Sequence, residues 1–129
     1  MNSFPYSNDN KRYRTLVYHN LQTYGGRVFK ATVDAGLSCP NAGGCVFCAQ
    51  NKPDTRTIEE QFAAEKARIL AKCPSAKILL YYGLRTNTNC SPERLSEMLC
   101  EAERLGAFAV SLATRPDCLD VDKARILAE

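Results

Sequence analysis

The sequence predicts an α/β fold in which three parallel strands alternate with helices. Three short runs rich in β-branched, aromatic and aliphatic residues (27–33, 77–82 and 108–112) alternate with segments whose apolar residues recur at helical spacing. Such alternation with short links favours parallel strands joined by right-handed crossovers. A full (β/α)₈ barrel takes about 250 residues. We therefore expect the 129 residues to form a partial, TIM-like barrel of three strand–helix units with two open sheet edges.

The first part of the chain is predicted to contain a tail, a helix and a strand. Residues 1–10 are rich in Asn and Ser and show no apolar period, so we expect a flexible tail before an ordered domain over 11–129. Apolar residues over 13–24 recur at near-helical spacing, and Gly25-Gly26 supplies a stop for that helix. The run 27–33 then predicts the first strand.

Capping signals mark the remaining helices. One helix is predicted to start at Thr57, which forms a capping box with Glu60. The next is predicted to start at Ser91, followed by Pro92, and the last at Asp120. Gly106 is expected to close the second of these helices. The compact apolar run 77–82 is interpreted as a buried strand. The last helix reaches Glu129 without a capping signal, so we expect the chain to be incomplete.

Composition excludes several classes of protein. Apolar residues make up 45% and charged residues 24%, fractions that are globular rather than fibrous or low-complexity. No apolar run approaches the roughly 20 residues of a membrane-spanning helix, and residues 1–10 lack the apolar core of a secretory signal. A net charge of +3 is too small to indicate nucleic acid by itself. Seven cysteines, an odd number, favour a reducing, cytoplasmic compartment over a disulfide framework.

Three of the seven cysteines fall within ten residues: Cys39, Cys45 and Cys48. Closely spaced thiolates in a glycine-rich loop suit a soft metal centre. Three ligands on a four-iron cluster would leave one iron open, which suggests chemistry rather than a structural role. On spacing alone, structural zinc with Asp34 or His19 as the fourth ligand stays open, and so do unligated thiols. His19 is otherwise interpreted as an ordinary surface histidine.

The segments that leave the three strands are where a site is expected, because ligands bind at the carboxyl ends of parallel strands. These segments are 34–39, 83–89 and 113–117, and all three carry thiols, small residues or polar donors. Two plainer interpretations stay open. Residues 86–88 could form a turn with local side-chain hydrogen bonds, and residues 115–117 a salt-bridged turn.

The motifs, taken together and in order, resemble the radical S-adenosylmethionine (SAM) enzymes, specifically the YhcC/YtqA-type branch related to the Elp3-like group. The motifs are Arg12-Tyr13, Arg27-Val28-Phe29-Lys30, Val33-Asp34-Ala35-Gly36, Cys39-Pro40-Asn41, Gly44-Cys45-Val46-Phe47-Cys48, Thr86-Asn87-Thr88 and Thr114-Arg115-Pro116-Asp117-Cys118-Leu119. They extend over nearly the whole chain after the tail, but over only the first part of the family's barrel. The resemblance thus implies that residues 11–129 are the N-terminal portion of a radical SAM core domain.

The resemblance implies roles for particular residues. Three cysteines are expected to ligate a [4Fe–4S] cluster whose open iron chelates SAM: Cys39, Cys45 and Cys48. Four residues are expected to contact SAM: Phe47 beside the adenine, and Gly83, Asn87 and Arg115 along the pocket. The family's chemistry is reductive cleavage of SAM to methionine and a 5′-deoxyadenosyl radical that abstracts hydrogen from a substrate. An electron donor such as flavodoxin or ferredoxin is implied, and tRNA is one possible substrate.

The sequence departs from the family in two motifs. The loop from Cys39 to Cys45 is shorter than the family's usual one, and Gly83 with Leu84 and Arg85 replaces a Gln followed by small and aromatic residues. The later strands, which supply most substrate contacts, are absent. Two other functions stay open: a zinc-stabilised binding module without catalysis, and a non-catalytic remnant that binds no cofactor.

Overall fold

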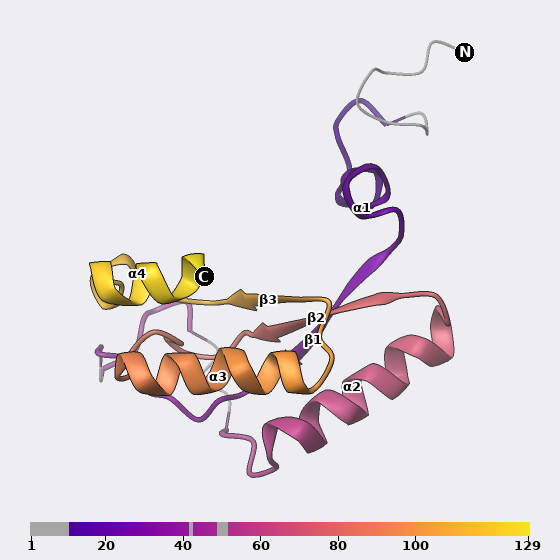
Figure 1. Ribbon diagram of the computed structural model, residues 1–129. Helices are drawn as coiled ribbons and strands as arrows, with labels where there is room; N and C mark the ends of the chain where they lie inside the picture. The colour runs from indigo at the N-terminus through magenta and orange to yellow at the C-terminus, as the bar shows by residue number, and fades with distance from the viewer. Residues whose placement is uncertain (1–10, 42, 49–51) are drawn as a thin grey trace.

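The computed structural model describes residues 11–41, 43–48 and 52–129 (Figure 1). The elements in chain order are α1 Leu16–Tyr24, β1 Val28–Val33, α2 Ile58–Lys72, β2 Lys77–Tyr82, α3 Pro92–Arg104, β3 Ala109–Leu112, the 3-10 turn η1 Pro116–Cys118 and α4 Val121–Ala128. The predicted alternation of strands and helices is confirmed. The flexible tail expected over 1–10 lies outside the described residues. None of the described helices has the length and apolar character needed to cross a bilayer.

The three strands form one parallel sheet in the order β1-β2-β3, which confirms the α/β prediction. Val28 pairs with Lys77 and Val33 with Tyr82, while Leu79 pairs with Ala109 on the other side of β2. Strands adjacent in sequence are adjacent in the sheet, so both crossovers advance in the same direction. Because crossovers are right-handed, the two crossover helices α2 and α3 pack on the same face.

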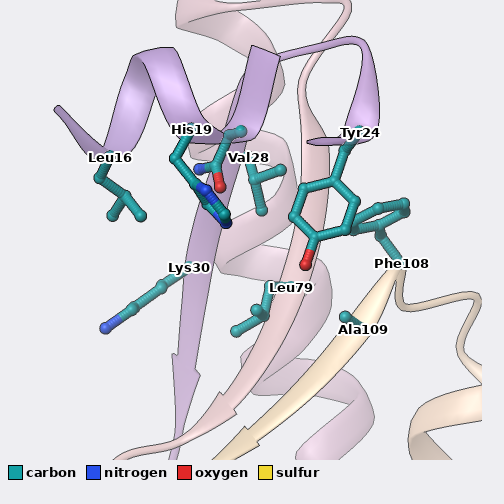
Figure 2. A pocket seen from close by; sticks show the side chains of 9 residues that line it. Leu16, His19, Tyr24, Val28, Lys30, Leu79, Phe108 and Ala109 are labelled. Carbon is teal, nitrogen blue, oxygen red and sulfur yellow. The ribbon is translucent and has the colours of Figure 1, made fainter. Parts of the chain in front are cut away.

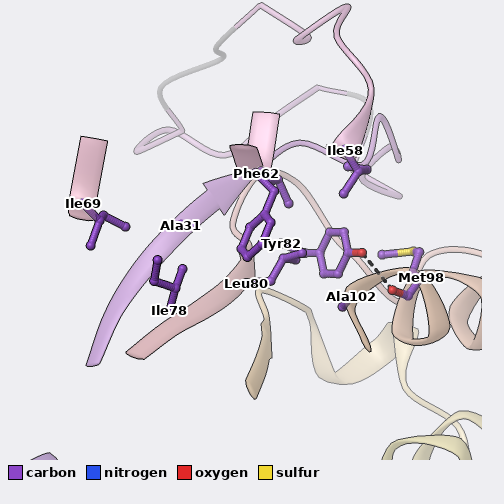
Figure 3. Packing of buried hydrophobic residues seen from close by; sticks show 10 residues of the cluster. Ala31, Ile58, Phe62, Ile69, Ile78, Leu80, Tyr82, Met98 and Ala102 are labelled. Atoms are coloured by element: carbon purple, nitrogen blue, oxygen red, sulfur yellow. Dashed lines mark hydrogen bonds between the residues drawn. The ribbon is translucent and has the colours of Figure 1, made fainter. Parts of the chain in front are cut away.

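The core lies between that face and the two helices (Figure 3). It consists of Ala31, Val33, Ile78, Leu80 and Tyr82 from the strands, with Ile58, Phe62, Ile69, Met98 and Ala102 from α2 and α3. The opposite face is partly open: Lys30 and Thr32 are exposed, and Leu79 and Tyr81 are half-buried. The prediction that 77–82 is a buried strand is therefore correct for one face only, since burial alternates along β2.

Side-chain caps set the helix starts. The predicted capping box is present: Glu60 N donates to Thr57 Oγ1 at 3.1 Å, and Thr57 N donates to the Glu60 carboxylate at 2.8 Å. The first helix starts at Leu16 rather than at residue 13, because Thr15 accepts a hydrogen bond from Tyr18 N at 3.1 Å and acts as the N-cap. The expectation of short links is wrong for the link between β1 and α2, which extends over residues 34–57.

Tyr82 is the largest fully buried side chain among the described residues, and its hydroxyl donates to the Met98 carbonyl at 2.9 Å. Burial, with a smaller contribution from the charge of Glu101, raises the pKa of Tyr82 to about 12. Because the folded protein favours the neutral phenol, Tyr82 contributes its full stability below the pKa of the unfolded chain, which is near 10. This contribution is lost as pH rises toward 12.

Tyr82→Phe should lower the free energy of unfolding by about 1 kcal/mol at pH 7, through the lost hydrogen bond. It should also remove a decline of about 2–3 kcal/mol that we expect between pH 10 and 12. Urea unfolding followed by circular dichroism across this range measures both effects. Tyr13→Phe, at an exposed side chain, is the control. An equal alkaline decline in the unaltered and Tyr82→Phe proteins would contradict the assignment.

Candidate functional site

The exits of the three strands meet at one end of the sheet. The Thr86 hydroxyl, after β2, donates to the Sγ atom of Cys39, after β1, at 3.2 Å. Asn87 N donates to the Ala113 carbonyl, after β3, at 3.0 Å. The hydroxyls of Thr88 and Thr114 are hydrogen-bonded to each other. Segments far apart in sequence are therefore joined by one network of hydrogen bonds at the carboxyl ends of the strands, where the sequence predicts a site.

Asn87 joins two of these exits from a fully buried position. Its Nδ2 atom donates to the carbonyls of Tyr82 at 2.9 Å and of Leu84 and Ala113 at 3.0 Å each. Its Oδ1 atom is buried and has no hydrogen-bond partner among the described residues. A buried acceptor without a partner costs free energy unless a bound group satisfies it. Asn87 thus both holds the exits together and offers one acceptor.

Residues 86–88 also belong to a local turn, in which Asn89 N donates to the Thr86 carbonyl at 3.1 Å. The plainer interpretation of this segment is therefore correct, but incomplete. The hydrogen bonds of Thr86, Asn87 and Thr88 reach the exits of the two neighbouring strands as well as the turn. One segment after β2 thus connects all three exits.

Asp34, directly after β1, accepts hydrogen bonds from three partners while its side chain is only 1% exposed. Gly36 N donates to Oδ1 at 2.9 Å, and Asp54 N donates to Oδ2 at 3.0 Å. Arg85 Nη1 donates to Oδ2 at 3.0 Å and forms an ion pair with it. The carboxylate therefore ties both ends of the cysteine-bearing loop to each other and to the exit of β2.

Gln61 fixes the backbone of Asp34. Asp34 N donates to the Gln61 Oε1 atom at 2.7 Å, and Gln61 Nε2 donates to the Asp34 and Arg56 carbonyls at 3.1 and 2.9 Å. No sequence pattern assigns these roles to Gln61, Asp54 or Arg85. One signal was available for Gln61: it is a polar residue on the buried stripe of α2, beside Ile58 and Phe62.

Two backbone features shape the exit of β2. Arg85 has φ of +64°, the one positive value at a non-glycine residue in the described part of the chain. A Cβ atom at Gly83 would lie 2.6 Å from Tyr81 Cε1 and 2.9 Å from Thr32 Cγ2. Position 83 therefore accepts only glycine without displacing side chains on the open face of the sheet. Glycine also lets a ligand approach the backbone closely.

The three cysteines of the loop lie at or near the surface of the protein. Cys39 and Cys48 are exposed, and Cys45 is partly exposed. Cys48 N donates to the Cys45 carbonyl at 2.9 Å, which closes a tight turn that leaves the Phe47 side chain 88% exposed at its tip. Within residues 11–41, 43–48 and 52–129, no three His, Cys, Asp or Glu side chains are grouped so as to hold a metal ion. The three thiols are thus not gathered, and their role as ligands stays a prediction.

Arg115, after β3, forms a two-pronged hydrogen bond with Asp117, at 2.9 Å from Nε to Oδ1 and 2.8 Å from Nη2 to Oδ2. The interpretation of 115–117 as a salt-bridged turn is confirmed. The hydrogen bond to Asp117 and that residue's charge raise the pKa of Arg115, with smaller contributions from Cys118 and Cys45. The Arg115 guanidinium is therefore already paired with a carboxylate of its own turn.

Neither residue considered as a fourth zinc ligand joins the cysteines. Both carboxylate oxygens of Asp34 are hydrogen-bonded. His19 lines a cavity of about 220 Å³ between α1 and the first residues of the strands (Figure 2). Its Nδ1 atom lies 3.1 Å from Arg14 Nη2. β1 has six residues, roughly 20 Å, and separates this cavity from the strand exits. His19 thus lies away from the cysteine loop, and the structure gives no support to the open alternative in which it is the fourth zinc ligand.

The chain is similar to several curated proteins of greater length. It is 39% identical to the uncharacterized protein YtqA of Bacillus subtilis over 143 aligned positions, which cover 99% of this chain and 44% of YtqA. It is 34% identical to the uncharacterized protein MJ0486 of Methanocaldococcus jannaschii, over 80% of this chain and 35% of that protein. It is 32% identical to YhcC of Escherichia coli, over 74% of this chain and 34% of YhcC.

The chain spans less than half the length of these relatives. The 143 aligned positions with YtqA exceed the 129 residues of this chain, so YtqA contains additional residues within the aligned region. No protein-family model matches the chain, and no solved structure matches it.

Proposed function

We propose that this chain is the N-terminal part of a radical SAM enzyme core, in which the cysteine loop holds a [4Fe–4S] cluster and the strand exits bind SAM. The three units would then be the first part of a TIM-like barrel, with the partly open face of the sheet turned toward its interior. One observation carries the proposal: the cysteine loop and the exits of β2 and β3 meet at one end of a sheet that winds in a single direction.

The residues present fit these groups chemically. Cys39, Cys45 and Cys48 are unpaired thiols with access to solvent, and thiolates are the usual ligands of iron–sulfur clusters. The Oδ1 atom of Asn87 is a buried acceptor that an N–H group of SAM could satisfy. Gly83 permits close approach of a ligand to the backbone.

The bound cluster and SAM would together supply a one-electron reductive cleavage that yields methionine and a 5′-deoxyadenosyl radical. The chain's own residues would bind and orient. Asn87 would accept a hydrogen bond from SAM, Phe47 would pack on the adenine, and Arg115 would border the pocket with its charge held by Asp117. Such a core needs a small electron-transfer protein such as flavodoxin or ferredoxin. tRNA is a candidate substrate, and the free state of all seven cysteines supports a cytoplasmic location.

The alternative is a zinc-stabilised binding module, which the same three thiols support. A remnant that binds neither metal is the third possibility. These three hypotheses differ in the metal that the purified chain binds, so measuring its iron and zinc content distinguishes them.

Anaerobic reconstitution with iron and sulfide, followed by electron paramagnetic resonance with and without SAM, tests the proposal. We expect a reduced-cluster signal that SAM perturbs, because an open iron can bind SAM. Cys45→Ala should abolish the signal, whereas Cys100→Ala, at an exposed cysteine on α3, should leave it intact. Stoichiometric zinc without iron would select the binding module, and failure to bind either metal would select the remnant.

A further inference from the structure

Thr86 is a buried threonine whose hydroxyl is hydrogen-bonded to a sulfur atom. Its side chain is fully enclosed, and its hydroxyl donates to the Cys39 sulfur at 3.2 Å. The two residues belong to different strand exits, 47 positions apart in sequence. Cys39 is an exposed residue and Thr86 is a buried one, so the hydroxyl reaches the sulfur from the protein side.

The neighbouring ion pair holds Thr86 in place. Arg85 adopts φ of +64°, a left-handed conformation that is strained for a non-glycine residue and persists only where its surroundings fix it. Its guanidinium is anchored on Asp34, whose carboxylate also binds the amides of Gly36 and Asp54 at the two ends of the cysteine loop. The turn that orients Thr86 is thus fastened to the same carboxylate that closes the loop bearing Cys39.

We propose that Thr86 is a positioning residue for Cys39, supported by the Asp34–Arg85 ion pair, and that it fixes one corner of the candidate metal centre from the exit of the neighbouring strand. The inference rests on the proposed metal site at the cysteines. A hydrogen bond to a metal-bound thiolate orients the ligand and draws negative charge from the sulfur. Changes to such outer contacts typically alter metal affinity by 10–100-fold, and hydrogen bonds to the sulfurs help to set cluster potential.

The test compares Thr86→Val, which keeps the shape but removes the hydroxyl, with Thr86→Ser, which keeps the hydroxyl. Co²⁺ alone is the affinity probe, followed through its thiolate absorption bands under reducing, anaerobic conditions. We expect Thr86→Val to weaken Co²⁺ binding about tenfold, and to lower the reduction potential of the reconstituted cluster because the donor no longer stabilises added negative charge. Thr86→Ser should restore both values toward those of the unaltered chain.

Unchanged affinity and potential in Thr86→Val would overturn the inference, and so would a Thr86→Ser protein that behaves like Thr86→Val. Either result leaves the proposed function standing, provided that the unaltered chain binds the metal. Failure of the unaltered chain to bind either Co²⁺ or an iron–sulfur cluster would instead refute the proposed function.

A metal-free measurement tests the support of Thr86 separately. Hydrogen–deuterium exchange should rise together over residues 36–41 and 84–89 in Arg85→Gln, since the ion pair joins the two segments. The matched control is Arg68→Gln, which removes an exposed ion pair with Glu65 on α2 and should leave both segments unchanged. A rise confined to 84–89 would show that the pair does not connect the loops and would overturn this part of the inference.

Discussion

Asp34→Ala should lower the free energy of unfolding by about 3–5 kcal/mol, the range expected when one partner of a buried ion pair is removed. The substitution leaves the amides of Gly36 and Asp54 without their acceptor, and it leaves the Arg85 guanidinium, whose side chain is 25% exposed, without its carboxylate. Both ends of the cysteine loop lose their attachment in a single step. Urea unfolding followed by circular dichroism measures the loss.

Asp34→Asn separates the effect of the negative charge from the effect of side-chain shape. The Asn amide keeps one hydrogen-bond acceptor but cannot form the ion pair. We expect an intermediate loss of stability. Asp54→Asn is the matched control, since the Asp54 carboxylate pairs with exposed Arg56 and exposed pairs contribute little. Equal, small effects of Asp34→Ala and Asp54→Asn would contradict the role of Asp34 as the fastening point of the loop.

The pH dependence of stability follows from the direction of the Asp34 pKa shift. Burial raises the pKa of Asp34, but hydrogen bonds from the Gly36 and Asp54 amides, together with Arg85, outweigh burial and lower it below the ordinary value of 3.8. A lowered pKa contributes stability above the unfolded value, and this contribution is lost as pH falls through the folded value. The difference in stability between the unaltered chain and Asp34→Asn should therefore shrink on acidification below about pH 4.

The helices and strands could be predicted because their signals are local. The capping box at Thr57 and the caps at Ser91 and Asp120 lie within three residues of the groups that they bind. The start of α1 was missed because the apolar spacing begins at Tyr13, whereas Thr15 supplies the cap. The burial of β2 was overestimated because a run of apolar residues does not reveal whether the second face of a sheet is covered.

The site could be predicted only as far as topology determines it. Parallel strands bring their exits to one edge, so the meeting of the exits of β1, β2 and β3 followed from the expected strand order. Spacing along the chain leaves Asp34 open only as a fourth zinc ligand. Its hydrogen bonds to Asp54 and Arg85 span 20 and 51 positions, so no local signal predicts them. The mutual placement of Cys39, Cys45 and Cys48 likewise depends on a loop whose shape no local pattern fixes.

Asn87→Asp should lower the free energy of unfolding by about 3 kcal/mol or more at neutral pH. Asn87 is fully buried, and its Nδ2 atom donates to three carbonyls, those of Tyr82, Leu84 and Ala113. A carboxylate at this position removes the donor and places a buried negative charge against three carbonyl oxygens. The exits of β2 and β3 would then repel where they are now joined.

The sign of the pH dependence distinguishes this mechanism from a simple packing defect. Burial beside carbonyl oxygens should raise the pKa of the introduced carboxyl above its unfolded value near 3.9, because both disfavour the charged form. The stability difference from the unaltered chain should therefore narrow as pH falls toward 4, since the protonated carboxyl is neutral and can donate one hydrogen bond. Asn89→Asp, at a residue whose amide binds the Ser38 carbonyl near solvent, should show only a small loss. A pH-independent deficit in Asn87→Asp would mean that lost packing, rather than the exchange of a donor for a charge, causes the destabilisation.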